Sequence, residues 1–195
     1  MKHSSNRELF DYWNERRGAR LAPERIDIEP GAIRRILGDT FMLEASGTDQ
    51  LFRLAGTRIC ALFGRELKGE SIFNLWRQSS HDTLAELLTV VVEEKLGVVA
   101  SAIGAPASDA LLPVKLEMLL LPLAYRSGTG TNARVLGALV PLTTPYWLRA
   151  KAIGPLELGI FRHVGGWDEA PAPRFQAAPG RIRYGLTVYD GGLTE

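Results

Sequence analysis

The sequence predicts an α+β fold in which helices cover one face of a five-stranded antiparallel sheet. Two helical segments come first along the chain, followed by two strands, a block of helices and three more strands. Strands grouped on both sides of a helical block favour antiparallel pairing, whereas a parallel sheet would require strands and helices to alternate strictly. A length of 195 residues suffices for one well-packed domain with terminal extensions.

An amphipathic helix is predicted over residues 5–17, because Leu9, Phe10 and Trp13 recur at helical spacing among charged residues. Large apolar side chains of this kind pack either on the rest of their own domain or on a second copy of the chain. The spacing leaves both arrangements open.

A second, short helix is predicted over residues 30–37, with Pro30 in its first turn and Gly38 at its end. A hairpin follows. Residues 41–45 alternate between apolar and polar side chains, residues 51–55 form the return strand, and a Gly-Thr-Asp turn separates the two.

Gly56 is expected to end the return strand, and Thr57 to cap a helix that reaches Phe63 and stops at Gly64. The best-defined helix spans residues 80–94. Leucines and valines recur there at positions i, i+3, i+4, i+7 and i+8, which buries one stripe of the helix against the sheet.

Three strands are predicted to complete the sheet, over residues 98–103, 114–121 and 134–142. In the middle strand alternate apolar residues share one face, while Lys115 and Glu117 point to the other.

The periodicity weakens after Thr143, and prolines accumulate in residues 167–181, which we expect to form a flexible, linker-like segment. The chain thus divides into an N-terminal helix and linker (residues 1–29), a core (residues 30–148) and a partly flexible C-terminal extension (residues 149–195).

Charge and cysteine content exclude several kinds of partner. Lys and Arg total 23 and Asp and Glu 22, so the basic excess that phosphate binding requires is missing, and neither nucleic acid nor a membrane is expected as a partner. The single cysteine, Cys60, allows no intramolecular disulfide and no thiolate-rich metal site. No stretch approaches the roughly 20 apolar residues of a membrane span, and no signal peptide is found, so we expect a cytoplasmic protein.

Two dense stretches carry a family resemblance, YWNERRGARLAPERIDIEP near the N-terminus and FRLAGTRICALFGRELKGESIFNLW in the middle. They resemble the short single-domain bacterial PAS proteins of the alpha-proteobacterial type, over about residues 9–162. Ala22 departs from the tighter opening loop of that family. The resemblance implies a PAS-like sheet, a regulatory role in signal transduction exerted through a protein partner, and a homodimer built through the N-terminal helix.

Neither a flavin nor a haem is expected, and the identity of any cofactor is left open. Flavin-binding PAS proteins react through a cysteine near the position of Cys60, but their N-C-R-F-L-Q context is missing, so we interpret Cys60 as a small buried hydrophobe. A haem would need an axial histidine on or beside the long helix. The one candidate, His81, sits at the helix start, where capping or exposure to solvent is favoured. No residues show metal-ligand spacing.

The sequence does not predict an enzyme, because no catalytic constellation is found. No serine lies in a G-x-S-x-G elbow, and the Gly-Thr-Gly at residues 128–130 lacks the lysine of a phosphate loop. A small enzyme on the same scaffold stays an alternative. It would require paired ionisable side chains inside the core.

A ligand pocket between the helices and the sheet is the remaining candidate site, because apolar walls with a few polar groups are how small ligands are held. An equally good interpretation is that the same residues fill a solid core. For Arg53, in the middle of a strand, a solvent-facing position is favoured. The candidate lining residues are Phe41, Leu43, Arg53, Leu54, Thr57, Cys60, Phe63, Leu84, Leu88, Leu116, Met118 and Leu139.

The sequence therefore predicts a sensor whose small-molecule ligand biases protein–protein contacts by binding two conformations unequally. The main alternative is a protein-interaction scaffold with a filled core and no ligand.

Overall fold

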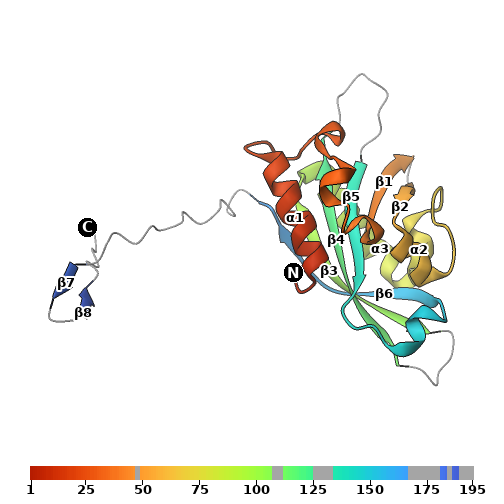
Figure 1. Cartoon of the computed structure of the whole chain (residues 1–195). Helices are drawn as coiled ribbons and strands as arrows, with labels where there is room; N and C mark the ends of the chain where they lie inside the picture. Colours follow the sequence, from red (N-terminus) through yellow and green to blue (C-terminus); the bar gives the residue numbers. More distant parts are fainter. Residues whose placement is uncertain (47–48, 107–111, 125–133, 167–180, 184–185, 189–195) are drawn as a thin grey trace.

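The computed structural model describes residues 1–46, 49–106, 112–124, 134–166, 181–183 and 186–188 (Figure 1). Its centre is an antiparallel six-stranded sheet with the strand order β2-β1-β5-β4-β3-β6. The strands are β1 (Thr40–Ser46), β2 (Asp49–Ala55), β3 (Gly97–Pro106), β4 (Val114–Leu123), β5 (Arg134–Pro141) and β6 (Ile153–Val164). A separate two-stranded sheet pairs β7 (Arg181–Arg183) with β8 (Leu186–Val188). The predicted α+β class and antiparallel pairing are confirmed.

Helices α2 (Thr57–Phe63) and α3 (His81–Thr89) cover one face of the six-stranded sheet, which we call the inner face (Figure 1). A π-helical turn over Val90–Glu94 continues α3. The predicted apolar stripe of this long helix is buried against the sheet. The predicted alternation in β4 is confirmed as well, since its inner face carries Val114, Leu116, Met118 and Leu120.

Helix α1 (Ser4–Arg17), the additional N-terminal helix, covers the opposite, outer face of the same sheet. Leu9 and Trp13 are fully buried there, and the indole Nε1 of Trp13 donates to the carbonyl oxygen of Pro122 at 2.8 Å. Helix α1 packs on this face because the side chains of the central strands that point outward are also apolar and are stabilised by burial away from water. They include Val99, Leu119, Leu121, Leu136 and Ala138.

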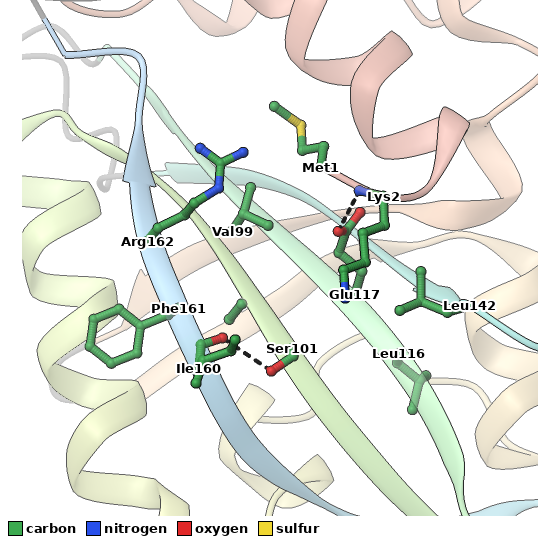
Figure 2. Close-up of a pocket in the computed structure, with 11 residues that line it drawn as sticks. Met1, Lys2, Val99, Ser101, Leu116, Glu117, Leu142, Ile160, Phe161 and Arg162 are labelled. Carbon is green, nitrogen blue, oxygen red and sulfur yellow. Dashed lines mark hydrogen bonds between the residues drawn. The ribbon is translucent and has the colours of Figure 1, made fainter.

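A buried carboxylate on the outer face holds the chain at the start of α1 (Figure 2). Glu117 of β4 accepts hydrogen bonds from the backbone N–H groups of Lys2 and His3, at 2.7 and 3.0 Å, and from the Asn6 side chain at 3.0 Å. Burial by itself raises the pKa of Glu117, but these hydrogen bonds outweigh it and hold the pKa below its usual range. The ionised carboxylate therefore ties the N-terminal segment to the sheet.

Strand β6 is the sixth strand, which the sequence did not predict. It pairs with β3 from Gly97↔Val164 to Pro106↔Ile153, and it forms one edge of the sheet. The sequence pattern places residues 153–164 in the partly flexible C-terminal extension. Their periodicity is weak because few of their side chains are buried, among them Leu156, and because two β-bulge irregularities interrupt the pairing. The stretch predicted to be flexible, residues 167–181, lies almost wholly outside the described residues.

The helix predicted over residues 30–37 is replaced by two short 3₁₀ helices, Pro30–Ile33 and Leu37–Asp39. Another 3₁₀ helix, Arg25–Asp27, precedes them. Three further 3₁₀ helices are described, Ile72–Leu75, Gln78–Ser80 and Tyr146–Arg149. The first and the last of them contribute buried side chains to the apolar cluster on the inner face.

The start of α2 differs from the prediction, while its end agrees. Gly56 is the N-cap residue, and Thr57 is the first helical residue, with no capping hydrogen bond from a side chain. A Cβ at Gly56 would lie 2.3 Å from the carbonyl oxygens of Leu37 and Gly38, so only glycine fits this backbone crossing. Gly64 ends the helix in the left-handed region, with φ of 67°, as predicted.

Candidate functional site

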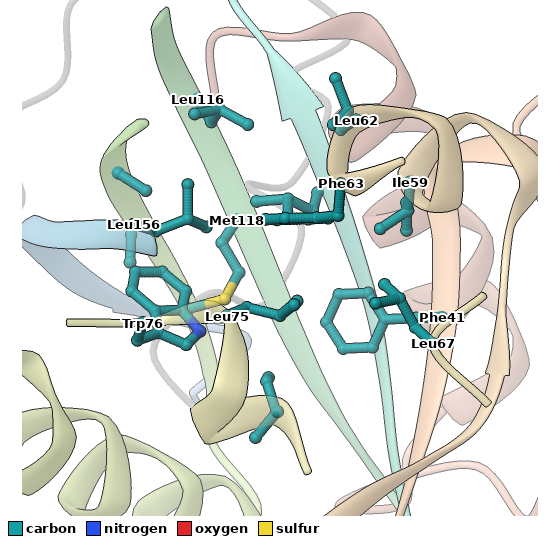
Figure 3. Close-up of a cluster of buried hydrophobic side chains, with 14 of the residues drawn as sticks. Phe41, Ile59, Leu62, Phe63, Leu67, Leu75, Trp76, Leu116, Met118 and Leu156 are labelled. Carbon is teal, nitrogen blue, oxygen red and sulfur yellow. The ribbon is translucent and has the colours of Figure 1, made fainter. Parts of the chain in front are cut away.

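The apolar cluster between the inner face and helices α2 and α3 is the candidate site (Figure 3). Most of the predicted lining residues belong to it. They come from three strands and both helices and are buried in one apolar cluster. These residues are Phe41, Leu43, Cys60, Phe63, Leu84, Leu88, Leu116, Met118 and Leu139. The sequence therefore located the inner apolar wall, although whether a ligand enters it stays a prediction.

The structure places three predicted lining residues elsewhere. Arg53 is exposed, and its guanidinium lies 3.6 Å from the carboxylate of Glu44. Thr57 is exposed at the first turn of α2. Leu54 is 52% exposed and pairs with Met42, whose side chain belongs to the outer cluster.

A register shift explains the position of Leu54. Met42 pairs with Leu54, but the next residue, Leu43, pairs with Phe52, so Arg53 is the extra residue of a bulge. Simple alternation would put Phe52 and Leu54 on the same face, whereas the bulge leaves only Phe52 on the inner face, 2% exposed. Phe52 is thus a residue of the site that sequence reasoning missed.

Two tryptophans of the inner cluster were also missed, and they bring the most distinctive polar groups of the site. Trp76 and Trp147 are each 4% exposed, and among the described residues neither indole Nε1 has a hydrogen-bond partner. An unsatisfied buried donor costs on the order of 1–3 kcal/mol. Both donors are therefore available to an acceptor, either water or a ligand. The indole N–H of a buried tryptophan usually has a hydrogen-bond partner. Each tryptophan in the sequence could therefore have been considered as a donor to a ligand.

Cys60 is buried, as predicted. Its thiol donates to the Ala55 carbonyl oxygen at 3.9 Å and to the Glu66 carboxylate at 3.8 Å. Burial, assisted by the nearby charge of Glu66, raises the pKa of the Cys60 thiol. The sulfur therefore stays protonated at neutral pH, which makes it a poor nucleophile.

His81 is the first residue of α3, at the helix start where the sequence placed it. Its Nε2 lies 3.2 Å from the carbonyl oxygen of Trp76, and its ring lies beside that of Phe73, with centroids 5.5 Å apart. This ring nitrogen is engaged by the backbone.

A polar connection joins the inner helix α2 to the outer helix α1. Arg58 of α2 donates from Nε and a terminal nitrogen to both oxygens of Asp39, at 2.6 and 2.9 Å. The pKa of Arg58 is raised, mainly by this hydrogen bond with Asp39. Asp39 is buried and also accepts a hydrogen bond from the Ser5 hydroxyl of α1 at 2.9 Å. One carboxylate thus contacts a helix from each face of the sheet.

The three residues proposed from sequence for a dimer contact lie on α1. Leu9 and Trp13 are buried against the sheet of their own chain, and Phe10 is partly buried and stacks on Trp13, with ring centroids 6.0 Å apart. A dimer contact through Leu9 or Trp13 would require α1 to leave this face.

The part of the chain that the structure describes contains neither a candidate metal-binding cluster nor a candidate membrane-spanning helix. No group of three or more His, Cys, Asp or Glu side chains there could hold a metal ion. None of the helices described is both long and apolar enough to span a membrane.

Solved structures of light-oxygen-voltage proteins are among those to which the chain is similar. One, from a study of a flavin analogue and the domain mechanism, is 14% identical, with a TM-score of 0.43, and the match covers 62% of this chain and 87% of that one. An RNA-binding light-oxygen-voltage receptor is 15% identical, with a TM-score of 0.42, and the match covers 58% of this chain and 33% of the receptor chain. The light-state domain of the blue-light photoreceptor aureochrome1 is 12% identical, with a TM-score of 0.41, and the match covers 62% of this chain and 92% of the aureochrome1 chain. No curated protein sequence matches the chain.

The PAS domain family gives the match that decides the classification. Its sequence profile covers residues 1–140 of the 195, from the N-terminal segment through most of β5. That stretch includes α1, the inner cluster up to Leu139 and the whole Ser5–Asp39–Arg58 connection, while β6 lies beyond it. The chain therefore belongs to the PAS domain family.

Proposed function

We propose that this PAS domain is a sensory module in which a small molecule, held between the inner face and helices α2 and α3, biases the contact of α1 with a protein partner. Membership of the PAS family fits a sensory or regulatory role in signalling. A ligand exerts such an effect only if it binds two conformations of the domain with different affinities.

The observation that carries the proposal is the Ser5–Asp39–Arg58 connection. Arg58 belongs to α2, which packs on the candidate site, and Ser5 belongs to α1 on the opposite face. A ligand that displaces α2 moves Arg58, which in turn shifts or releases Asp39 and weakens the hold on Ser5. Charge-assisted hydrogen bonds of this kind are short and directional, so a small displacement of one partner is felt by the next.

The two indole N–H groups support the ligand half of the proposal. An apolar wall with a few oriented donors is the usual composition of a small-molecule site. A ligand that carries a carbonyl or carboxylate oxygen would satisfy Trp76 or Trp147 and would gain specificity from doing so.

Thermal shift and native mass spectrometry of the full chain across a panel of metabolites test the proposal. We expect at least one oxygen-bearing metabolite to raise the melting temperature, and to bind less well to Trp76→Phe, which keeps an aromatic ring but loses the donor. Hydrogen exchange should then show that the same metabolite changes protection of the α1 amides in the unaltered chain.

Ser5→Ala cuts the connection at its α1 end and leaves Asp39 and Arg58 paired, so it should abolish the response of α1 while leaving metabolite binding intact. Ser4→Ala, an exposed serine one residue earlier, is the matched control. A panel with no binder would support the filled-core scaffold instead. A bound metabolite that leaves α1 exchange unaltered would contradict the proposed output.

A further inference from the structure

A cavity lies on the outer face of the sheet. It has a volume of about 160 Å³ and lies between the N-terminal segment and strands β3, β4 and β6 (Figure 2). Its apolar lining includes Val99, Leu142 and Ile160. Ile160 is 85% exposed, so a large apolar side chain stands at the rim with little cover from the described residues.

The charged side chains of this cavity are Lys2, Glu117 and Arg162. Both oxygens of Glu117 already accept hydrogen bonds from the N-terminal segment, as described above. The Lys2 and Arg162 side chains are exposed, and neither has an ion-pair partner among the residues that the structure describes. Two uncommitted cations beside one carboxylate that is fully hydrogen-bonded leave the site with a net positive charge. Anions are therefore favoured over cations.

From this cavity we infer a binding site for a small aromatic monocarboxylate, separate from the ligand site of the proposed function. An enclosed apolar cavity of about 150 Å³ is known to accommodate benzene, so a volume of about 160 Å³ is large enough for a single aromatic ring. The ring would lie among Val99, Leu142 and Ile160, and the carboxylate would face Arg162 and Lys2. The guanidinium suits this role because it offers two parallel donors to a carboxylate.

The site adjoins the hydrogen bonds that tie the N-terminal segment to β4. Lys2 lines the cavity with its side chain, and its backbone N–H donates to Glu117. Occupancy should therefore order the first residues of the chain and slow the exchange of their amides with solvent.

A titration of the isotope-labelled full chain with benzoate, followed by NMR, tests this inference. We expect the largest shifts at amides near Val99, Ser101 and Arg162, and weaker binding of benzyl alcohol, which has the ring but not the charge. Because Arg162 is exposed, Arg162→Gln should weaken benzoate binding by about two- to fivefold and leave benzyl alcohol unaffected. Arg53→Gln is the control, since it removes an exposed arginine on the opposite edge strand.

Three results would overturn the inference. These are equal binding of benzyl alcohol and benzoate, equal effects of the two arginine substitutions, and the absence of shifts around β3 and β6 at millimolar benzoate. Shifts confined to Trp76 and its neighbours would assign benzoate to the inner site instead. The outer site and the proposed sensory function can thus fail independently.

Discussion

Glu117 and Arg53 are both charged residues in the middle of strands, yet the structure gives them opposite surroundings. Arg53 is the extra residue of a bulge on an edge strand, and it points to solvent. Glu117 is buried on a central strand under the N-terminal segment. A buried charge is tolerated only when hydrogen bonds replace its water, and three N–H donors do so here. The partners of a side chain, rather than its type, decide its role.

Replacing Glu117 by Gln should destabilise the domain at neutral pH. An amide cannot accept from all three donors, so we expect the free energy of unfolding at pH 7 to fall by about 1–3 kcal/mol, measured by urea denaturation. Glu86→Gln, an exposed change on α3, is the control and should have little effect.

The difference in the free energy of unfolding between the unaltered chain and Glu117→Gln should depend on pH. Because the folded-state pKa of Glu117 lies below the ordinary value of 4.5, its stabilisation is fully present above that value and is lost as the pH falls through the folded-state pKa. The gap between the unaltered chain and Glu117→Gln should therefore narrow below about pH 4. A gap that stays constant would show that Glu117 acts by packing alone.

Among the elements, the edge strand β6 makes hydrogen bonds on both of its sides over its first half. On one side it pairs with β3, and on the other the Arg77 N–H donates to the Leu156 carbonyl oxygen at 2.8 Å. The Leu158 N–H donates to the Ser80 hydroxyl at 3.0 Å. Ser80 is the N-cap residue of α3, but it makes no capping hydrogen bond with its side chain. Its hydroxyl binds the edge strand instead.

Ser80→Ala should loosen this attachment. Loss of the hydroxyl leaves the Leu158 N–H without its acceptor, so we expect faster hydrogen exchange at that amide and a stability loss of about 1 kcal/mol. Ser79→Ala, the exposed neighbour, controls for a change in local helix propensity. Equal exchange rates in both variants would mean that Ser80 does not hold β6.

At the scale of the whole molecule, the sheet is covered on both faces. Helices α2 and α3 cover the inner face and α1 the outer face, and the two apolar clusters share the same central strands. Strand β6 contributes to both of them through Leu156 and Val164. Residues 153–164 are therefore part of the six-stranded sheet and of its packing on both faces.

Leu156→Ala should show this directly. The side chain is fully buried, so truncation should cost about 2–5 kcal/mol in chemical denaturation, together with a lower melting temperature. Ile160→Ala on the same strand removes an exposed side chain and should change stability by less than about 0.5 kcal/mol. If both variants were as stable as the unaltered chain, β6 would not be integral to the fold.

The α+β class, the order of the first five strands and the apolar inner face of the sheet could be predicted from the amino-acid sequence alone. These follow from local patterns: the stripe of Leu84 and Leu88 on α3, the alternation in β4, and the glycine stop at Gly64. Each pattern lies within one element, so periodicity alone reveals it. Nine of the twelve proposed lining residues were placed in the inner cluster on this basis.

The position of α1, the pairing of the sixth strand and the face occupied by Leu54 could not be predicted from the sequence. The amphipathic pattern of α1 shows which of its sides is buried but not which surface buries it, because that surface comes from strands far away in the sequence. An edge strand such as β6 buries few side chains and shows little alternation. The bulge at Arg53 turns Leu54 to the other face. All three features depend on contacts between segments that are distant in the sequence. The local spacing of apolar and polar residues does not reveal such contacts.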